Sequence, residues 1–142
     1  MRKKKPAWPA DIDLAQRFPH PTNTSVVAFL TNGSLWSAHS DPAEEFYFGL
    51  KEIPDAKVYC PDIKSYAYHM AYTPHGVIFG LVIGLSSIYL RLPQSQEWAK
   101  SNCRNPFPEV GPEWYEFLVN CDRGFSSSKW LRRAYDEAVA LT

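Results

Sequence analysis

The stretch KVYCPDIKSYAYHMAYTPHGVIFGLVIGLSSIYLRL, residues 57–92, decides the fold of this chain. Residues 65–73 alternate small or polar residues with large ones, which places the large ones on one face of a strand: Tyr66, Tyr68, Met70 and Tyr72. Residues 77–83 are almost entirely apolar and rich in β-branched side chains, as is typical of a central strand buried on both faces. Residues 88–92 alternate again, and residues 58–60 form an edge strand that Pro61 ends. The stretch therefore predicts four strands.

The connections between these strands indicate how they pair. Residues 73–76 (TPHG) and 84–87 (GLSS) are short and contain Pro or Gly, which suits tight turns between antiparallel neighbours. A membrane helix is the rival interpretation, because residues 76–90 carry no charge. That run is shorter than the roughly 20 residues of a spanning helix, and Gly80 and Gly84 interrupt it. We therefore expect an antiparallel meander in a protein that does not contact the membrane.

Composition limits the class of protein. The chain has 142 residues, of which 45% are hydrophobic and 15% aromatic, values that predict one globular domain with a single core. The 15 basic and 15 acidic residues cancel, so no net field steers nucleic acid or an anionic membrane. Four of the basic residues are consecutive at residues 2–5, which leaves the rest of the chain with four net negative charges.

The start of the sequence and its cysteines predict a cytoplasmic location. The basic start leads into Pro6, Pro9 and Asp11, where a secretory signal would have an apolar run. The three cysteines are too few and too irregularly spaced for a disulfide framework, and their odd number suits reduced thiols.

Residues 1–24 and 25–39 precede the main body. Residues 1–24 contain four prolines and predict an arm, partly irregular, in which Asp11 caps one helical turn through residues 13–16; residues 25–142 form the domain. In residues 25–39 the pair Asn32-Gly33 favours a β-hairpin, preceded by the β-branched pair Val26 and Val27. The alternative is a short helix over residues 26–31 that stops at Gly33.

The remaining segments predict three helices and one more strand. Asp41 and Pro42 predict a helix start, with Asp41 as the cap, and Pro54 ends that helix near residue 53. Residues 94–101 predict a short helix, residues 102–112 a loop, and residues 114–119 a strand, with a helix beginning at Pro112 as the alternative. A C-terminal helix follows the serines at 126–128, with apolar residues at helical spacing. The fold class expected is α+β: a single domain with an antiparallel sheet of about four to six strands flanked by helices.

Residues 42–140 resemble the TfoX amino-terminal domain family and the related YjbR-type proteins. The matching elements are the helix that ends at residues 50–54, the strands at 66–72, 76–82 and 88–92, the aromatic segment 114–117 and the closing helix at 130–138. The resemblance implies a small α+β domain linked to regulation, with DNA or protein binding inferred for some members and no established catalytic centre. It transfers no catalytic residue, and the first 41 residues are not covered by it.

Two sets of residues are candidates for binding. A pocket on the tyrosine-rich face is the small-ligand hypothesis, with Tyr66, Tyr68, His69, His75 and Trp114 as its lining. Stacked tyrosines also bind nucleic-acid bases, but residues 65–87 contain no Lys or Arg to accompany them. Nucleic-acid contacts would come instead from basic residues elsewhere: Arg2, Lys3, Lys4, Lys5, Arg132 and Arg133.

Motifs for metal, cofactor or catalysis are weak. The Cys60-Pro61 pair near His69 and His75 suggests a thiol, haem or metal site, yet no two Cys or His residues stand within five positions of each other. A cysteine that packs on an edge strand explains Cys60 better. No catalytic or nucleotide-binding motif occurs, so we expect no metal, no cofactor and no catalytic residue.

Three functional hypotheses remain from the sequence. The leading one is a non-enzymatic, cytosolic regulatory domain that binds a protein partner or a second copy of itself. The second is a nucleic-acid-binding protein, and the third is a small-ligand-binding protein or enzyme with a pocket on the tyrosine-rich face.

Overall fold

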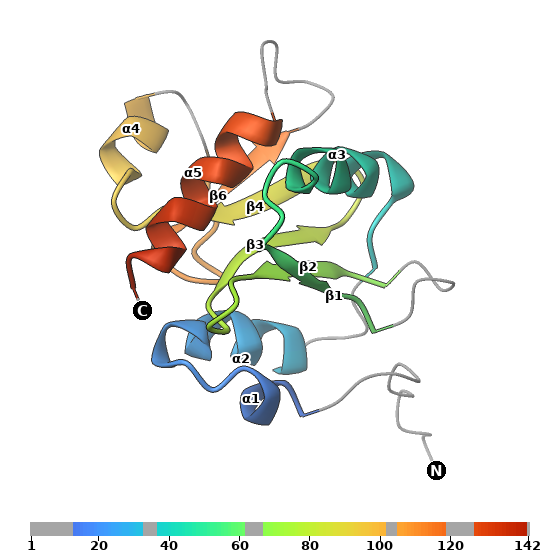
Figure 1. The fold of residues 1–142 in the computed structure, drawn as a ribbon, viewed down its shortest axis with the longest axis vertical. Helices are drawn as coiled ribbons and strands as arrows, with labels where there is room; N and C mark the ends of the chain where they lie inside the picture. Colours follow the sequence, from blue (N-terminus) through green and yellow to red (C-terminus); the bar gives the residue numbers. More distant parts are fainter. Residues whose placement is uncertain (1–12, 33–36, 62–66, 102–104, 119–126, 142) are drawn as a thin grey trace.

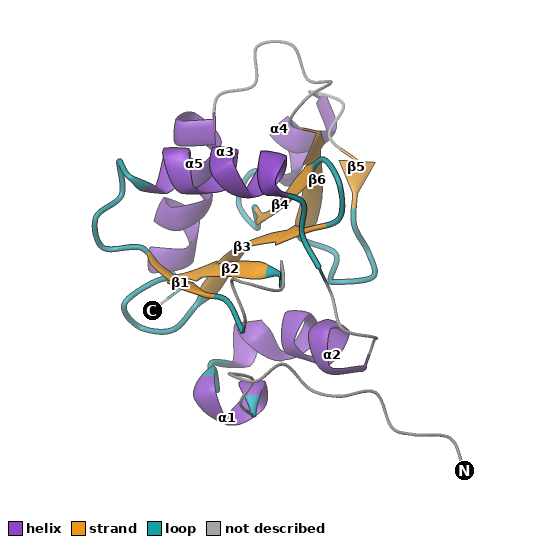
Figure 2. Cartoon of the chain, turned by 90° about the vertical axis from the view of Figure 1, so that its right-hand side faces the viewer, coloured by secondary structure: helices purple, strands orange, loops and turns teal. Residues whose placement is uncertain are grey.

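A computed structural model describes residues 13–32, 37–61, 67–101, 105–118 and 127–141. These residues form three layers, a β-sheet with helices packed on both of its faces (Figures 1 and 2). The expected α+β fold with an antiparallel sheet is confirmed. Within the described ranges no helix is long and apolar enough to cross a membrane.

The sheet has six strands in the order β1-β2-β3-β4-β6-β5, and every neighbouring pair is antiparallel. The strands are β1 (Lys57–Tyr59), β2 (His69–Tyr72), β3 (Ile78–Ile83), β4 (Ser87–Arg91), β5 (Asn105–Pro106) and β6 (Trp114–Leu118). The meander, the edge position of β1 and the strand at β6 were all predicted correctly. The prediction of an unbroken loop over residues 102–112 is wrong, because β5 pairs with β6 there.

The central strand β3 is buried along its whole length, as its uninterrupted apolar sequence predicts. Gly80 lies where the strand passes under the ring of Phe46: a Cβ at Gly80 would lie 3.0 Å from Phe46 Cε1. Glycine at this position allows the helix that carries Phe46 to approach the sheet closely.

Helices α3 (Ser40–Leu50) and α5 (Ser127–Val139) cover the first face of the sheet. Their buried residues join one hydrophobic core with the strands, and Phe46, Leu131 and Ala134 are fully buried in it. The side chain that caps α3 is His39, whose Nδ1 accepts from Asp41 N (3.1 Å). The prediction of Asp41 as the cap is therefore wrong: Asp41 lies in the first turn, where its charge favours the positive end of the helix.

Helices α1 (Leu14–Arg17) and α2 (Thr24–Asn32) cover the second face (Figure 2). They form a second core with the large side chains of β2 and β3, in which Val26, Val27 and Leu30 face the sheet from α2. The predicted hairpin over residues 25–39 is wrong for its first half, because Val26, Val27 and Leu30 have the spacing of a helix face and the sheet has a second apolar face to cover. Residues 33–36, which include Gly33, lie outside the described residues.

The described part of the predicted N-terminal arm is thus packed against the domain. Asp13, rather than Asp11, caps the single turn of α1, through its Oδ1 and the N–H groups of Ala15 and Gln16. A 3₁₀ turn, η1 (Pro21–Asn23), leads into α2. The buried amide of Asn23 joins this turn to the β2–β3 connection: Nδ2 donates to Gly76 O (2.7 Å), and Oδ1 accepts from Ile78 N (2.9 Å).

Helix α4 (Gln96–Ser101) lies beside α5 and contacts β5, at the edge of the sheet opposite β1. The buried carboxylate of Glu137 on α5 accepts from Gln94 N (2.7 Å) and from Ser95 Oγ. The Trp98 and Trp130 rings lie 3.8 Å apart between their centroids, with the guanidinium of Arg133 over both. These contacts hold α4 against α5.

Candidate partner-binding groove

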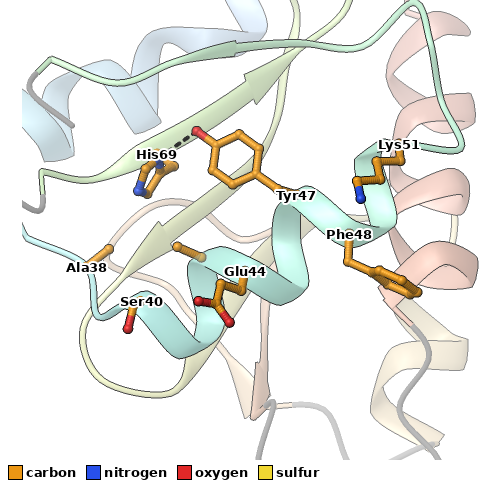
Figure 3. Close-up of a pocket in the computed structure, with 8 residues that line it drawn as sticks. Ala38, Ser40, Glu44, Tyr47, Phe48, Lys51 and His69 are labelled. Atoms are coloured by element: carbon orange, nitrogen blue, oxygen red, sulfur yellow. Dashed lines mark hydrogen bonds between the residues drawn. The ribbon is translucent and has the colours of Figure 1, made fainter.

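A groove runs along the exposed side of α3, between that helix and the start of β2. It has a volume of about 420 Å³ and is lined by Ala38, Ser40, Ala43, Glu44, Tyr47, Phe48, Lys51 and His69 (Figure 3). The α3 residues of this set recur every three or four positions, which places them along one side of the helix. Most of its lining surface is apolar, and Glu44 and Lys51 add one charge of each sign.

The polar end of the groove is a pair formed by Tyr47 and His69. Tyr47 Oη lies 2.8 Å from Nδ1 of His69, and the rings meet edge to face (Figure 3). Burial, with a smaller contribution from the nearby Cys60, raises the pKa of Tyr47 to about 12. Burial also lowers the pKa of His69 below its ordinary value of 6.5. Both side chains are therefore neutral at pH 7 and can offer hydrogen bonds but no charge.

A second cavity adjoins the groove at the start of α3. Its volume is about 510 Å³, and it shares Ala38 and Ser40 with the groove. The backbone there is held in place because Gly84 N donates to Ser37 O and His39 N donates to Gly84 O, both at 2.8 Å. Leu85, which is 77% exposed, also lines this cavity. The second cavity therefore lies next to the groove, at the start of α3.

Two exposed apolar side chains line these two cavities. Among the described residues the large hydrophobic side chains that remain exposed are Leu85 (77%), Phe48 (59%) and Val139 (40%). Phe48 and Leu85 line the groove and the adjoining cavity, whereas Val139 is at the end of α5. Phe48 and Leu85 therefore add exposed apolar surface to the lining of the two cavities.

Acidic residues lie on α3 and just after its end, close to Phe48 in the sequence. Asp41, Glu44 and Glu52 are exposed, and Glu45 is half-buried. Within the described part of the chain Glu44, Glu45 and Glu52 form no ion pair, and Asp41 has only the weak 3.8 Å contact with His39. Lys51 sets one positive charge against these four carboxylates, so this stretch of the chain carries a net negative charge.

The structure does not bring the predicted pocket residues together. Tyr68 and Trp114 are buried in the core under α1 and α2, on the opposite face of the sheet from the groove. His75 is exposed in the β2–β3 turn, and Tyr66 lies outside the described residues. Only His69 lines the groove.

The residues predicted to contact nucleic acid do not form a described site either. Arg2, Lys3, Lys4 and Lys5 lie outside the described residues. Arg132 pairs with Asp136 (3.4 Å) on the same helix, and Arg133 lies over two tryptophan rings and donates to Ser95 Oγ (3.1 Å). Both arginines on α5 are thus engaged within the domain.

Sequence reasoning missed the α3 residues of the groove. One signal was present: Phe46, Leu50 and Ile53 share the buried face of this helix, while Phe48 falls off it. Tyr47 gave no such signal, because its partner His69 is 22 positions away and meets it only through the fold. No group of three His, Cys, Asp or Glu side chains that could hold a metal ion occurs among the residues the structure describes.

Comparison with protein-family models, with curated proteins and with solved structures found no match for this chain. The resemblance to the TfoX amino-terminal and YjbR-type proteins therefore stays a prediction.

Proposed function

We propose that this protein is a non-enzymatic binding domain, regulatory in role, that contacts a protein partner through the groove along α3. The observation that carries the proposal is the position of Phe48, a large apolar side chain left exposed in the lining of the groove, with Leu85 likewise exposed in the adjoining cavity. Aromatic side chains such as Phe48 are enriched in interfaces, where a few buried anchors contribute most of the affinity.

The chemistry of the groove supports binding over catalysis. Tyr47 and His69 are neutral at pH 7, and a phenol with a pKa of about 12 is a poor general acid. A nucleophilic mechanism requires an activated nucleophile held by a base, and the Tyr47–His69 pair presents a phenol that burial keeps protonated. The groove is open along the helix surface, and a shape of this kind suits an extended segment or a helix of a partner.

The test compares two matched variants, Phe48→Asp on the groove and Val139→Asp on α5. Both place a carboxylate at an exposed apolar position, so both should fold and keep the unfolding midpoint of the wild type within a few degrees. Proteins that bind the tagged wild-type chain are quantified by mass spectrometry against each variant. We expect a partner that Phe48→Asp loses by at least about tenfold and Val139→Asp retains.

Two results would contradict the proposal. One is a partner whose recovery depends on Val139 or on neither residue. The other is turnover of a small substrate by the purified protein that Phe48→Asp leaves intact, since the groove would then be irrelevant to the activity.

A further inference from the structure

The surface around Phe48 combines an apolar centre with negative charge. Phe48 is 59% exposed. Asp41 and Glu45 precede it at positions i−7 and i−3 on the same side of α3, and Glu52 follows it at i+4, just beyond the end of the helix. Glu44, which lines the groove together with Phe48, adds a fourth carboxylate to this acidic stripe, and Lys51 in the same lining carries the one opposite charge. A ligand that matches this surface has an apolar anchor for Phe48 and several positive charges for the carboxylates.

The chain itself contains a segment of that composition. Residues 2–9 read RKKKPAWP, with four consecutive basic residues followed by Trp8 between two prolines. Four consecutive basic residues occur nowhere else in the sequence, and the rest of the chain has four net negative charges. Prolines disfavour a helix and restrict the backbone to extended conformations, which lowers the entropy that such a segment loses on binding.

The layers of the fold decide which copy of the chain this segment can reach. The segment joins the described domain at Asp13, the cap of α1, and α1 packs on the face of the sheet opposite α3 (Figure 2). Asp13 is five positions after Trp8, and five positions of fully extended chain span about 18 Å at most. The two helix layers are separated by two packing distances of on the order of 10 Å each, and a chain has to pass around the sheet edge as well. Trp8 therefore cannot reach Phe48 of its own copy.

We propose that residues 2–9 of one chain bind the α3 groove of a second copy, with Trp8 against Phe48 and the basic residues against the acidic stripe. This inference rests on the proposed function, because it names the occupant of the same groove. Exchange of the two segments gives a closed, two-fold symmetric dimer, in which each copy donates one segment and accepts one.

Sedimentation velocity over a range of concentrations tests the dimer. The wild-type chain of 16.2 kDa is expected to double its mass as its concentration rises, and high salt is expected to weaken the dimer because exposed charges are screened. Trp8→Ala and Phe48→Asp should each weaken the dimer by about 30-fold or more, as expected for a central aromatic anchor. Val139→Asp, the matched control on α5, should dimerise as the wild type does.

Charge reversal adds a readout that loss of folding cannot imitate. Lys3→Glu with Lys4→Glu should weaken the dimer, and so should Glu44→Lys with Glu45→Lys. All four changes in one chain should restore it, because the opposite charges face each other again.

Three results would overturn the inference: a wild-type chain that stays monomeric at the highest attainable concentration, a dimer that survives both Trp8→Ala and Phe48→Asp, or a failure of the fourfold charge reversal to restore association. The proposed function is separable from this outcome. A monomeric wild-type chain that still loses another protein partner through Phe48→Asp would overturn the self-association and leave the groove as the binding surface.

Discussion

The absence of a side chain at Gly80 determines how closely α3 can approach the sheet. A Cβ at this position would lie 3.0 Å from Phe46 Cε1 and 3.4 Å from Leu90 Cδ2, with both neighbours buried. We expect Gly80→Ala to lower the free energy of unfolding by about 1–3 kcal/mol, the usual cost of overpacking a core. Denaturant unfolding measures this change.

A double-mutant cycle with Phe46→Leu identifies the cause. Because leucine lacks the ring atoms that the new Cβ would meet, Gly80→Ala should cost less in the Phe46→Leu background than in the wild type. An equal cost in both backgrounds would show that the Phe46 ring is not what Gly80 accommodates.

His69 makes stability depend on pH. Burial lowers the pKa of His69 below 6.5 in the folded chain, so below pH 6.5 the unfolded chain binds a proton that the folded chain resists. The free energy of unfolding should therefore fall as pH decreases from about 7 through 6.5 towards the lowered pKa.

Replacing the histidine isolates its share of this dependence. Stability of His69→Gln should fall less steeply with acid than that of the wild type, measured by urea unfolding at several pH values. The exposed turn residue His75 provides the matched control, and His75→Gln should keep the wild-type slope. Identical slopes for the wild type and His69→Gln would contradict the buried, neutral state of His69.

At the scale of elements, the sheet was predictable from the sequence because its pattern is local. The period of two in β2 and β4 and the unbroken apolar run of β3 each lie within one short segment. The helix α2 was predicted only as the alternative to a hairpin, over residues 26–31, and the structure confirms that alternative. Val26 and Val27 favour a strand, and what makes them helical is the second face of the sheet, which Tyr68, Met70 and Leu81 present from distant parts of the sequence.

The same limit applies to the candidate groove. The sequence indicated that Phe48 lies off the buried face of its helix, but the pairing of Tyr47 with His69 and the position of Leu85 beside Ala38 depend on the packed fold. The predicted site residues Tyr68 and Trp114 were aromatic because they fill a core, and sequence alone cannot separate an aromatic core from an aromatic pocket.

The attachment of the α1 and α2 layer to the sheet depends on Asn23. Its amide satisfies the carbonyl of Gly76 in the β2–β3 connection and the N–H of Ile78 at the start of the central strand. We expect Asn23→Ala to lower the free energy of unfolding by about 2–3 kcal/mol, because it leaves these backbone groups without a partner. Thr24→Ala, which removes an exposed hydroxyl one position later, should cost clearly less.

Hydrogen exchange locates the effect of Asn23. In Asn23→Ala the amide of Ile78 should exchange faster relative to that of Leu81 in the middle of the same strand. An unchanged exchange rate at Ile78 would mean that the hydrogen bond from Ile78 N to Asn23 does not hold the α1 and α2 layer to the sheet.

At the scale of the whole molecule, the three layers separate two roles. The face under α1 and α2 is closed by a core, whereas the α3 side retains a groove, an exposed Phe48 and a negative surface. The N-terminal basic segment leaves from the closed side and complements the open side of another copy. The arrangement predicts that association depends on α3 and spares α2.

The central claim is that the α3 groove receives a basic segment with an aromatic anchor, and backbone amide NMR tests it most directly. The probe is a synthetic peptide of residues 1–12, titrated into a ¹⁵N-labelled full chain that carries Trp8→Ala and so leaves its own groove open. We predict that the amide signals of Ala43, Phe48 and Lys51 shift and saturate, while those of Val26 and Val27 in α2 stay fixed. Absence of shifts on α3 at about 1 mM peptide, or equal shifts with a peptide that carries Trp8→Ala, would contradict the account.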